Sequence, residues 1–185
     1  MNKIMSERKP AMHYVCTREQ GRALVRAHTQ FFVSNCGCRE NRGGCARSRP
    51  DVCLAFAENA AGAGSGRKEV TAADVEALFD EAERAHLVVR PFRNEARTAA
   101  EGICFCCDDC CYYFLNPQEE CDCGAAVEHT NRAECNLCGE CVAACHFHAR
   151  RLEDQELLVD RGRCYGCGLC RDVCPQNCIE MVPRR

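Results

Sequence analysis

The sequence predicts an α+β protein of two units, a mainly helical, cysteine-rich region over 1–129 and a second unit over 130–185. Two observations support this prediction. Cysteine supplies 21 of the 185 residues, and in the last 51 residues it recurs in two copies of one pattern. The first 129 residues instead carry apolar side chains at helical spacing, interrupted by cysteine-rich coil.

The cysteines are expected to be reduced and to bind metal. Their number is odd, and a secretory signal is not recognisable, because Met1 to Ala11 carries basic residues without an apolar run after them. A membrane span is not expected either, because the mean hydropathy is −0.35 and no run approaches 18 apolar residues. We therefore expect a cytoplasmic protein whose thiols are committed to metal ions or clusters.

Charge is distributed unevenly along the chain. Residues 1–50 hold 10 basic against 3 acidic side chains, whereas residues 51–134 hold 7 basic against 17 acidic ones. The basic segment has two interpretations, a surface that docks an acidic protein or a nucleic acid, and ordinary solvated arginines on helix faces.

The first 70 residues predict helices separated by coil. A helix is expected over 17–33, where Gly21 is a weak point in an apolar stripe. A glycine-rich coil with three cysteines follows, then a short helix over 51–60. The composition of 60–68 predicts a flexible linker.

The next segment predicts a helix followed by a hairpin. Thr71 and Asp74 have the spacing of an acidic capping box for a helix over 72–86, whose apolar residues recur at i, i+3, i+4 and i+7. A strand is expected over 87–89, stopped by the arginine and proline that follow, with 102–106 as its antiparallel partner. This order is compatible with a small winged-helix-like unit. A turn is expected at Asn116-Pro117.

The cysteine pattern of the last 51 residues is the strongest signal for function. It reads Cys135-x2-Cys138-x2-Cys141-x3-Cys145 and then Cys164-x2-Cys167-x2-Cys170-x3-Cys174-Pro175. Two-residue gaps let a tight loop surround three corners of an iron–sulfur cubane. A fourth cysteine three residues further on starts a segment that points away, so it reaches the other cluster.

These residues resemble the bacterial two-[4Fe–4S] ferredoxin domain. The resemblance implies short hairpins, two short helices and two [4Fe–4S] clusters, and it makes structural zinc a much weaker interpretation of these eight thiols. It also implies the ligand sets: Cys135, Cys138, Cys141 and Cys174 for cluster 1, and Cys164, Cys167, Cys170 and Cys145 for cluster 2.

Three further residues need an interpretation. His146 stands where the family usually has proline, and we expect a surface residue; the alternative is a residue near a cluster that tunes its potential. Cys178 stands where the family commonly has a small residue, and we expect a buried apolar thiol rather than a ligand. Cys16 is likewise expected to be structural.

The other cysteines form two groups that predict one or two further metal centres. Iron–sulfur clusters are favoured over Zn²⁺, because the chain already has cubane motifs and thiolates suit both. Cys36, Cys38, Cys45 and Cys53 form the candidate third centre. The candidate ligands of a fourth or shared centre are Cys104, Cys106, Cys107, Cys110, Cys111, Cys121 and Cys123. The segments 36–39 and 104–107 also resemble cysteine-rich ferredoxin-like proteins of anaerobes, a resemblance that implies no particular activity.

The function expected is single-electron transfer to and from redox partner proteins, either as a free carrier or within a larger oxidoreductase. Whether the protein is an enzyme stays open: one alternative is an oxidoreductase subunit whose N-terminal cluster is catalytic. A redox-responsive DNA-binding regulator is disfavoured, because the expected helix over 72–86 is acidic and suits a phosphate backbone poorly.

Overall fold

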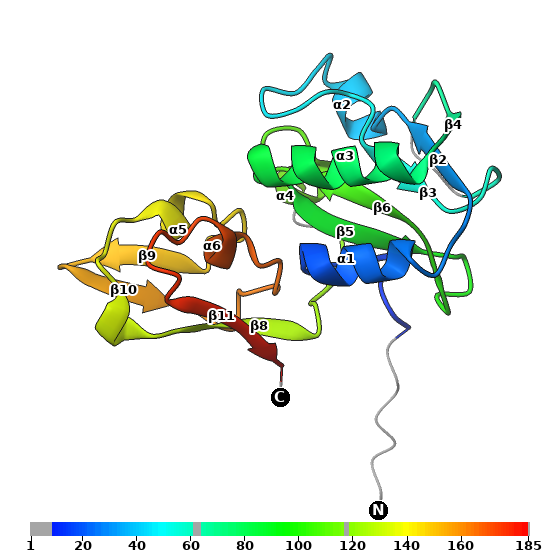
Figure 1. The fold of residues 1–185 in the computed structure, drawn as a ribbon. Coiled ribbons are helices and arrows are strands. Elements are labelled where there is room, and N and C mark those ends of the chain that lie inside the picture. The colour runs from blue at the N-terminus through cyan, green and yellow to red at the C-terminus, as the bar shows by residue number, and fades with distance from the viewer. Residues whose placement is uncertain (1–8, 61–63, 117–118, 185) are drawn as a thin grey trace, which may run out of the picture.

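A computed structural model describes residues 9–60, 64–116 and 119–184 and has an α+β architecture with two lobes (Figure 1). The larger lobe is built on a seven-stranded sheet and holds the N-terminal part of the chain. The smaller lobe holds the C-terminal part, in which two-stranded sheets accompany short helices. The expected α+β class is therefore confirmed.

The sheet of the larger lobe has the strand order β4-β2-β3-β6-β5-β1-β7, with neighbours antiparallel except for the parallel pair β1 and β7. Its strands are β1 (His13–Tyr14), β2 (Phe31–Ser34), β3 (Cys53–Ala55), β4 (Lys68–Val70), β5 (Val88–Arg93), β6 (Ala100–Cys106) and β7 (Cys121–Asp122). The helices of this lobe are α1 (Arg18–Val25), α2 (Gly37–Asn41), α3 (Ala72–Arg84) and α4 (Tyr112–Leu115).

Helices α1 and α3 cover one face of this sheet and enclose the main core (Figure 1). Val75, Leu78 and Phe79 of α3 are at most 2% exposed and pack with Leu54 of β3 and Ile103 of β6. The expected capping box is present, because Thr71 and Asp74 each bond the other's backbone N–H. The helix predicted over 72–86 is therefore confirmed, with its end two residues earlier.

The prediction of a mainly helical, winged-helix-like N-terminal unit is wrong, because a seven-stranded sheet is its centre. The helix expected over 17–33 ends at Val25, and Phe31–Ser34 forms a strand instead. The segment 51–60 likewise contains β3 in place of a helix. Aromatic and β-branched residues such as Phe31 and Val33 favour strands once neighbours exist, and β2 pairs with β3 on one side and β4 on the other.

The expected hairpin is confirmed, but β5 is longer than predicted and runs through Pro91. Val89 O accepts from Cys16 N, and Arg93 N donates to Met12 O. Pro91 lies between Val89 and Arg93, and its backbone nitrogen faces the same side of β5 as theirs, toward the very short β1. The backbone N–H that proline lacks would therefore point to a side of β5 with few inter-strand hydrogen bonds. A strand tolerates proline at such a position.

In the smaller lobe the first and last strands pair with each other, and a hairpin lies between them in the sequence. Strands β8 (Ala126–Thr130) and β11 (Ile179–Pro183) pair along their whole length, and β9 (Arg150–Glu153) pairs with β10 (Glu156–Val159). The short helices are α5 (Glu140–Ala143), α6 (Leu169–Asp172) and the 3-10 helix η1 (Arg132–Glu134). The boundary expected between residues 129 and 130 falls inside β8. The linker expected over 60–68 and the turn at Asn116-Pro117 lie partly outside the described residues.

Aromatic side chains and ion pairs join the two lobes. Phe147 and Tyr165 stack with ring centroids 4.5 Å apart, and Phe114 of α4 in the larger lobe contacts Phe147. Arg18 Nη1, at the start of α1, lies 2.8 Å from Asp172 Oδ2 at the end of α6, and both side chains are largely buried. The lobes therefore form a continuous packed interface.

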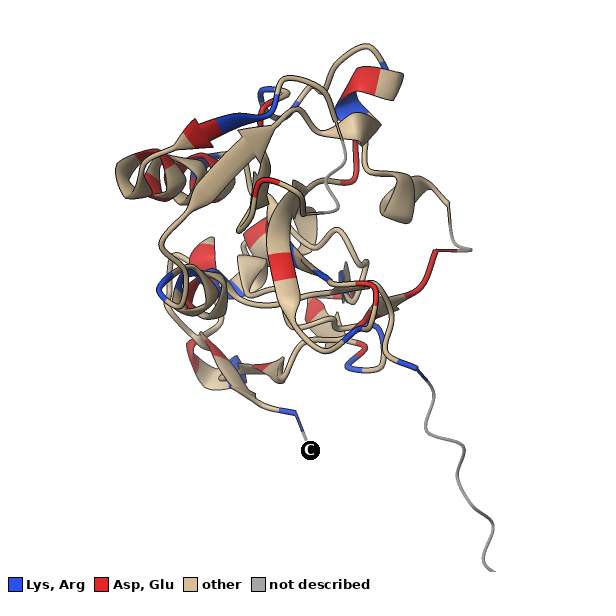
Figure 2. Cartoon of the chain, turned by 90° about the vertical axis from the view of Figure 1, so that its right-hand side faces the viewer, with Lys and Arg blue, Asp and Glu red and all other residues tan. Residues whose placement is uncertain are grey.

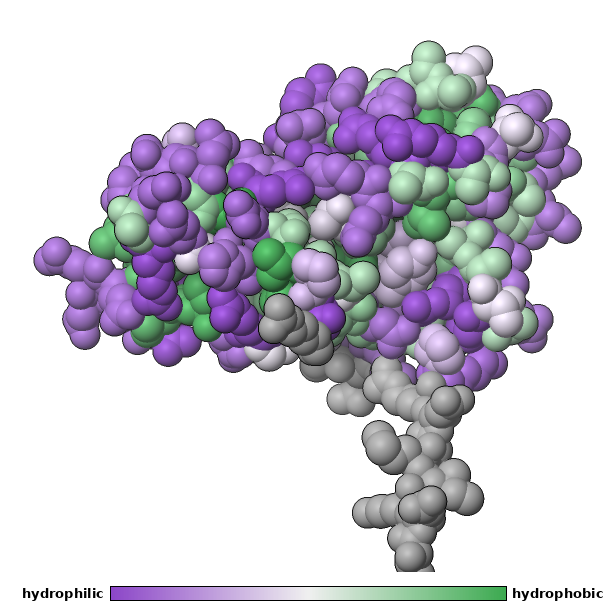
Figure 3. Space-filling model, turned by 60° about the horizontal axis from the view of Figure 1, so that its bottom comes forward, coloured by the Kyte–Doolittle hydropathy of each residue, from purple (hydrophilic) through white to green (hydrophobic). Residues whose placement is uncertain are grey.

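Ion pairs across the sequence balance the uneven charge. Arg22 Nε lies 2.8 Å from Glu76 Oε2, and Arg47 Nε lies 2.7 Å from Asp108 Oδ1. The face in Figure 2 accordingly shows acidic and basic residues interspersed. The face in Figure 3 is mainly hydrophilic, with apolar residues in small patches. Among the described residues, no helix has the length and apolar character needed to cross a membrane.

Gly21 is the contact point of α1 with the core. A Cβ placed there would stand 2.8 Å from Val89 Cγ1 and 3.0 Å from Phe79 Cε1. We predict that Gly21→Val lowers stability by about 1–3 kcal/mol through overpacking. The midpoint of thermal unfolding under anaerobic conditions should fall by several degrees. Ala23→Val on the exposed side of the same helix is the control; an equal loss in both variants would contradict this account.

Candidate metal sites

Two cavities in the smaller lobe are each lined by four thiols of the repeated pattern. The first is lined by Cys135, Cys138, Cys141 and Cys174. The second is lined by Cys145, Cys164, Cys167 and Cys170. Each cavity thus takes three thiols from one copy of the pattern and the fourth from the other copy.

One-turn helices explain this exchange of the fourth thiol. Gly139 and Gly168 precede α5 and α6 with φ of 84° and 85°, a left-handed conformation that favours glycine. The chain turns there from the thiol-bearing loop into the helix. Cys145 follows the end of α5 and reaches the second cavity, whereas Cys174 follows α6 and reaches the first.

The residues around the cavities fit a thiolate-bound iron–sulfur cluster. Each donor set consists of four sulfur atoms, the ligands that such clusters take. Arg150 Nε is buried without a hydrogen-bond partner among the described residues. The guanidinium of Arg150 also lies near the thiols of Cys141 and Cys170, one from each cavity. The positive charge of this buried guanidinium would balance the negative charge of a cluster, and its unpaired Nε–H could donate to a cluster sulfide.

A buried ion pair holds Arg150 in this position. Its Nη1 lies 2.8 Å from Glu128 Oε2, and both side chains are 1% exposed. Burial alone would raise the pKa of Glu128, but the Thr130 hydroxyl and the charge of Arg150 lower it overall. The carboxylate is therefore ionised and keeps the guanidinium between the two cavities.

His146 is buried, so the expectation of a surface residue is wrong. It is 3% exposed, its Nε2 lies 2.8 Å from the carbonyl oxygen of His86, and its Nδ1 lies 3.2 Å from Asp108 Oδ2. The carbonyl can only accept, so Nε2 carries a hydrogen. The residue after Cys145 thus links the smaller lobe to the larger one.

Cys178 and Cys16 are both buried, as expected. Cys178 Sγ lies 3.5 Å from Cys174 Sγ, and Cys178 also lines the first cavity. Burial raises the pKa of the Cys16 thiol to about 12, which keeps it protonated and unreactive.

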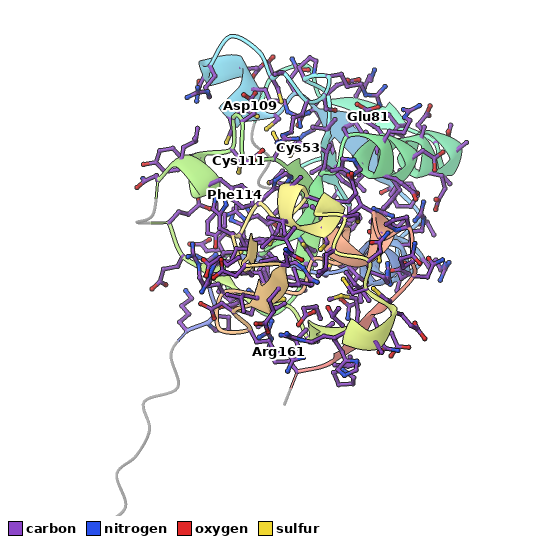
Figure 4. The ribbon with its side chains drawn as sticks, turned by 90° about the vertical axis from the view of Figure 1, so that its left-hand side faces the viewer. Cys53, Glu81, Asp109, Cys111, Phe114 and Arg161 are labelled. Carbon is purple, nitrogen blue, oxygen red and sulfur yellow. The ribbon has the colours of Figure 1, made fainter. Side chains whose placement is uncertain are left out.

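Six thiols of the larger lobe form a connected chain, which we call the six-thiol chain. Each thiol lies close enough to the next to shift its pKa, in the order Cys36, Cys38, Cys111, Cys106, Cys104 and Cys53. Cys53 and Cys104 are register partners on β3 and β6. Figure 4 shows Cys53 and Cys111 on one side of the molecule below α2. The chain combines members of both groups that were distinguished by sequence.

A second buried arginine lies beside the six-thiol chain. Arg90 is 3% exposed, and its Nη1 lies 3.5 Å from Cys111 Sγ. Burial alone would lower the pKa of Arg90, but nearby Cys106 and Glu119 raise it overall, so the guanidinium is charged. Cys121 is buried in the same region, whereas Cys123 is exposed and borders a separate hollow with Tyr14 and Arg93.

The remaining three cysteines of the larger lobe meet at a separate point. Cys45 Sγ lies 3.5 Å from Cys107 Sγ, which lies 3.4 Å from Cys110 Sγ. Cys45 therefore contacts members of the second cysteine-rich segment, not the Cys36, Cys38 and Cys53 with which it was grouped by sequence.

Comparison with known proteins identifies the smaller lobe. The model of the 4Fe-4S dicluster domain matches residues 134–179. An uncharacterized ferredoxin of Methanocaldococcus jannaschii is 36% identical over 47 residues, which are 25% of this chain and 76% of that protein. Subunit IorA of the indolepyruvate oxidoreductase of Archaeoglobus fulgidus is 30% identical over 57 residues, which are 31% of this chain.

The chain belongs to the [4Fe–4S] dicluster ferredoxin family through this lobe. The resemblance seen in the cysteine pattern is thereby confirmed. The aligned part spans only 9% of the length of IorA, so the similarity concerns one domain of that subunit.

The Arg150–Glu128 pair should set the reduction potential of the iron–sulfur centre. A nearby positive charge stabilises the more negative, reduced state. We predict that Arg150→Gln lowers the potential and Glu128→Gln raises it, each on the order of tens of millivolts. Redox titration followed by EPR measures both.

Arg151→Gln is the matched control, because Arg151 follows in sequence but is 58% exposed. It should leave the potential unchanged. Shifts of the same sign in Arg150→Gln and Glu128→Gln would contradict the electrostatic explanation.

Proposed function

We propose that this protein is an electron carrier that passes single electrons through two [4Fe–4S] clusters. Cys135, Cys138, Cys141 and Cys174 are the proposed ligands of cluster 1, and Cys145, Cys164, Cys167 and Cys170 those of cluster 2. The observation that carries the proposal is the pair of four-thiol cavities in a dicluster ferredoxin domain. In this proposal the domain begins at residue 126, because β8 is the partner of β11.

The side chains around the cavities have distinct roles in this function. A [4Fe–4S] cluster bound by four thiolates accepts and returns one electron. Arg150 supplies positive charge to both cavities. Phe147 and Tyr165 line the second cavity and, stacked on each other, limit access of water from the side of the larger lobe. Restricted solvent access is one of the factors that set the potential of such a centre.

The six-thiol chain supports a further iron–sulfur centre in the larger lobe. It contains more thiols than one cubane requires, and they extend over a distance instead of converging on one point. Spread thiols suit a polynuclear cluster, whose ligands bind different irons. Arg90 would partly neutralise that centre. The larger lobe would then lengthen the electron path that the smaller lobe begins.

A role as one subunit of a larger oxidoreductase is the second candidate. It is favoured by the similarity to IorA, a subunit of indolepyruvate oxidoreductase. In that case the six-thiol chain would hold the centre nearest to the substrate. A cluster iron there with only three thiolates would favour this candidate over the plain carrier.

Metal analysis of anaerobically purified protein tests the carrier proposal. We expect at least about 8 iron and 8 acid-labile sulfide per chain, and more if the six-thiol chain holds a cluster. EPR should show reducible cubane signals during a redox titration. Fewer than about 8 iron with no reducible cubane signal would overturn the proposal.

Paired serine variants test the ligand assignment. Cys174→Ser should lose or alter one cluster, seen as lower iron content and a changed EPR signal, because a proposed ligand is removed. Cys178→Ser, altered at the thiol 3.5 Å away, should keep both clusters. Loss of a cluster in Cys178→Ser with retention in Cys174→Ser would reverse the assignment of these two residues.

A further inference from the structure

Three thiols of the larger lobe converge on a point that neither cavity of the smaller lobe includes. Cys45 comes from the loop after α2, and Cys107 and Cys110 come from the turn after β6. Their sulfur atoms all lie within 4.8 Å of one another. Cys107 and Cys110 are at most 3% exposed, and Cys45 is half-buried. We call this set the three-thiol site.

The two segments that carry these thiols are tied together independently of the sulfur atoms. Ala46 N donates to Asp109 Oδ2 at 2.9 Å, directly beside Cys45 and Cys110 in sequence. Arg47 forms a two-point contact with Asp108, with distances of 2.7 and 3.1 Å. These hydrogen bonds hold the two segments, and therefore their thiols, close together.

A buried arginine supplies positive charge to the three-thiol site. Arg39 is 1% exposed and donates to the carbonyl oxygens of Arg49 and Phe105. Its guanidinium also lies near the Cys110 thiol, and its Nε has no partner among the described residues. A charge of this kind is costly to bury unless negative groups face it. Thiolates bound to a metal ion at the site would provide that negative charge.

The sulfur separations indicate a single ion. A tetrahedral Zn²⁺ with Zn–S bonds of about 2.3 Å holds its sulfur ligands about 3.8 Å apart. The separations of 3.4 and 3.5 Å need only a slight expansion to reach this value. The thiolates of a cubane bind four different irons and therefore lie farther apart.

The charge balance agrees with the geometry. Three thiolates and one Zn²⁺ carry a net charge of about −1, which the single positive charge of Arg39 neutralises.

The geometry points to a Zn²⁺ ion bound by Cys45, Cys107 and Cys110, with water as its fourth ligand. Among the described residues, no other histidine, cysteine or carboxylate ligand atom joins this set within 4.8 Å. This site goes beyond the proposed electron transfer, because Zn²⁺ has no redox chemistry. It would fix the loop after α2 to the turn after β6, and thereby position the six-thiol chain, whose members flank both segments.

Zinc analysis of the full-length holoprotein tests the site. After anaerobic purification from zinc-supplemented medium, elemental analysis should give about one zinc per chain, beside the iron of the clusters. X-ray absorption at the zinc edge should show three sulfur neighbours and one lighter neighbour. Absence of zinc, or four sulfur neighbours, would overturn the proposal; this measurement needs no variant.

Variants locate the ion. Cys45→Ser and Cys110→Ser should bind zinc at least about ten-fold more weakly in competition with a chelator, while iron, sulfide and the cubane EPR signals stay unchanged. Cys16→Ser, at a buried single thiol, is the control and should keep its zinc. Zinc retained in both site variants, or iron and sulfide lost in place of zinc, would overturn the proposal. Loss of the cubane signals in unaltered protein would instead contradict the proposed electron transfer.

Discussion

Compensation of charge between thiolates and buried arginines is the interaction on which the structure depends. Closely spaced thiolates repel one another, and burial strengthens that repulsion. Each thiol assembly has one buried arginine beside it: Arg39 at the three-thiol site, Arg90 at the six-thiol chain and Arg150 between the two cavities. All three are at most 4% exposed. The buried thiols and arginines thus lie beside one another, with Glu119 and Glu128 as further partners of Arg90 and Arg150.

The C-terminal end of β6 shows how the fold separates thiols that are adjacent in sequence. Cys104 and Cys106 share one face of the strand, because side chains alternate along it. Cys107 follows the end of the strand and packs with the core on the helix side. Cys106 and Cys107 therefore belong to different assemblies although they are neighbours in the chain.

Parts of this arrangement could be predicted from the sequence, and others could not. Helix α3 and its capping box follow from local spacing, and the four-thiol cavities follow from a pattern whose spacing encodes the geometry. Strand β2 could not be predicted, because a short apolar run such as 31–33 suits a helix or a strand until its partners are known. Cys45 was grouped by chain proximity, but β6 brings a distant segment nearer to it. The burial of Arg39 could not be predicted either, although the cysteine-rich segment 36–39 ends on this residue.

His146 has a consequence for how the protein is assembled. It follows Cys145 directly, and its ring contacts the carbonyl oxygen of His86 and the carboxylate of Asp108, which itself follows Cys107. One imidazole therefore couples a cavity thiol of the smaller lobe to a thiol of the larger lobe through neighbouring backbone. The segments around Cys145 and Cys107 are therefore held to one another across the boundary between the lobes, so a displacement of either segment is transmitted to the other.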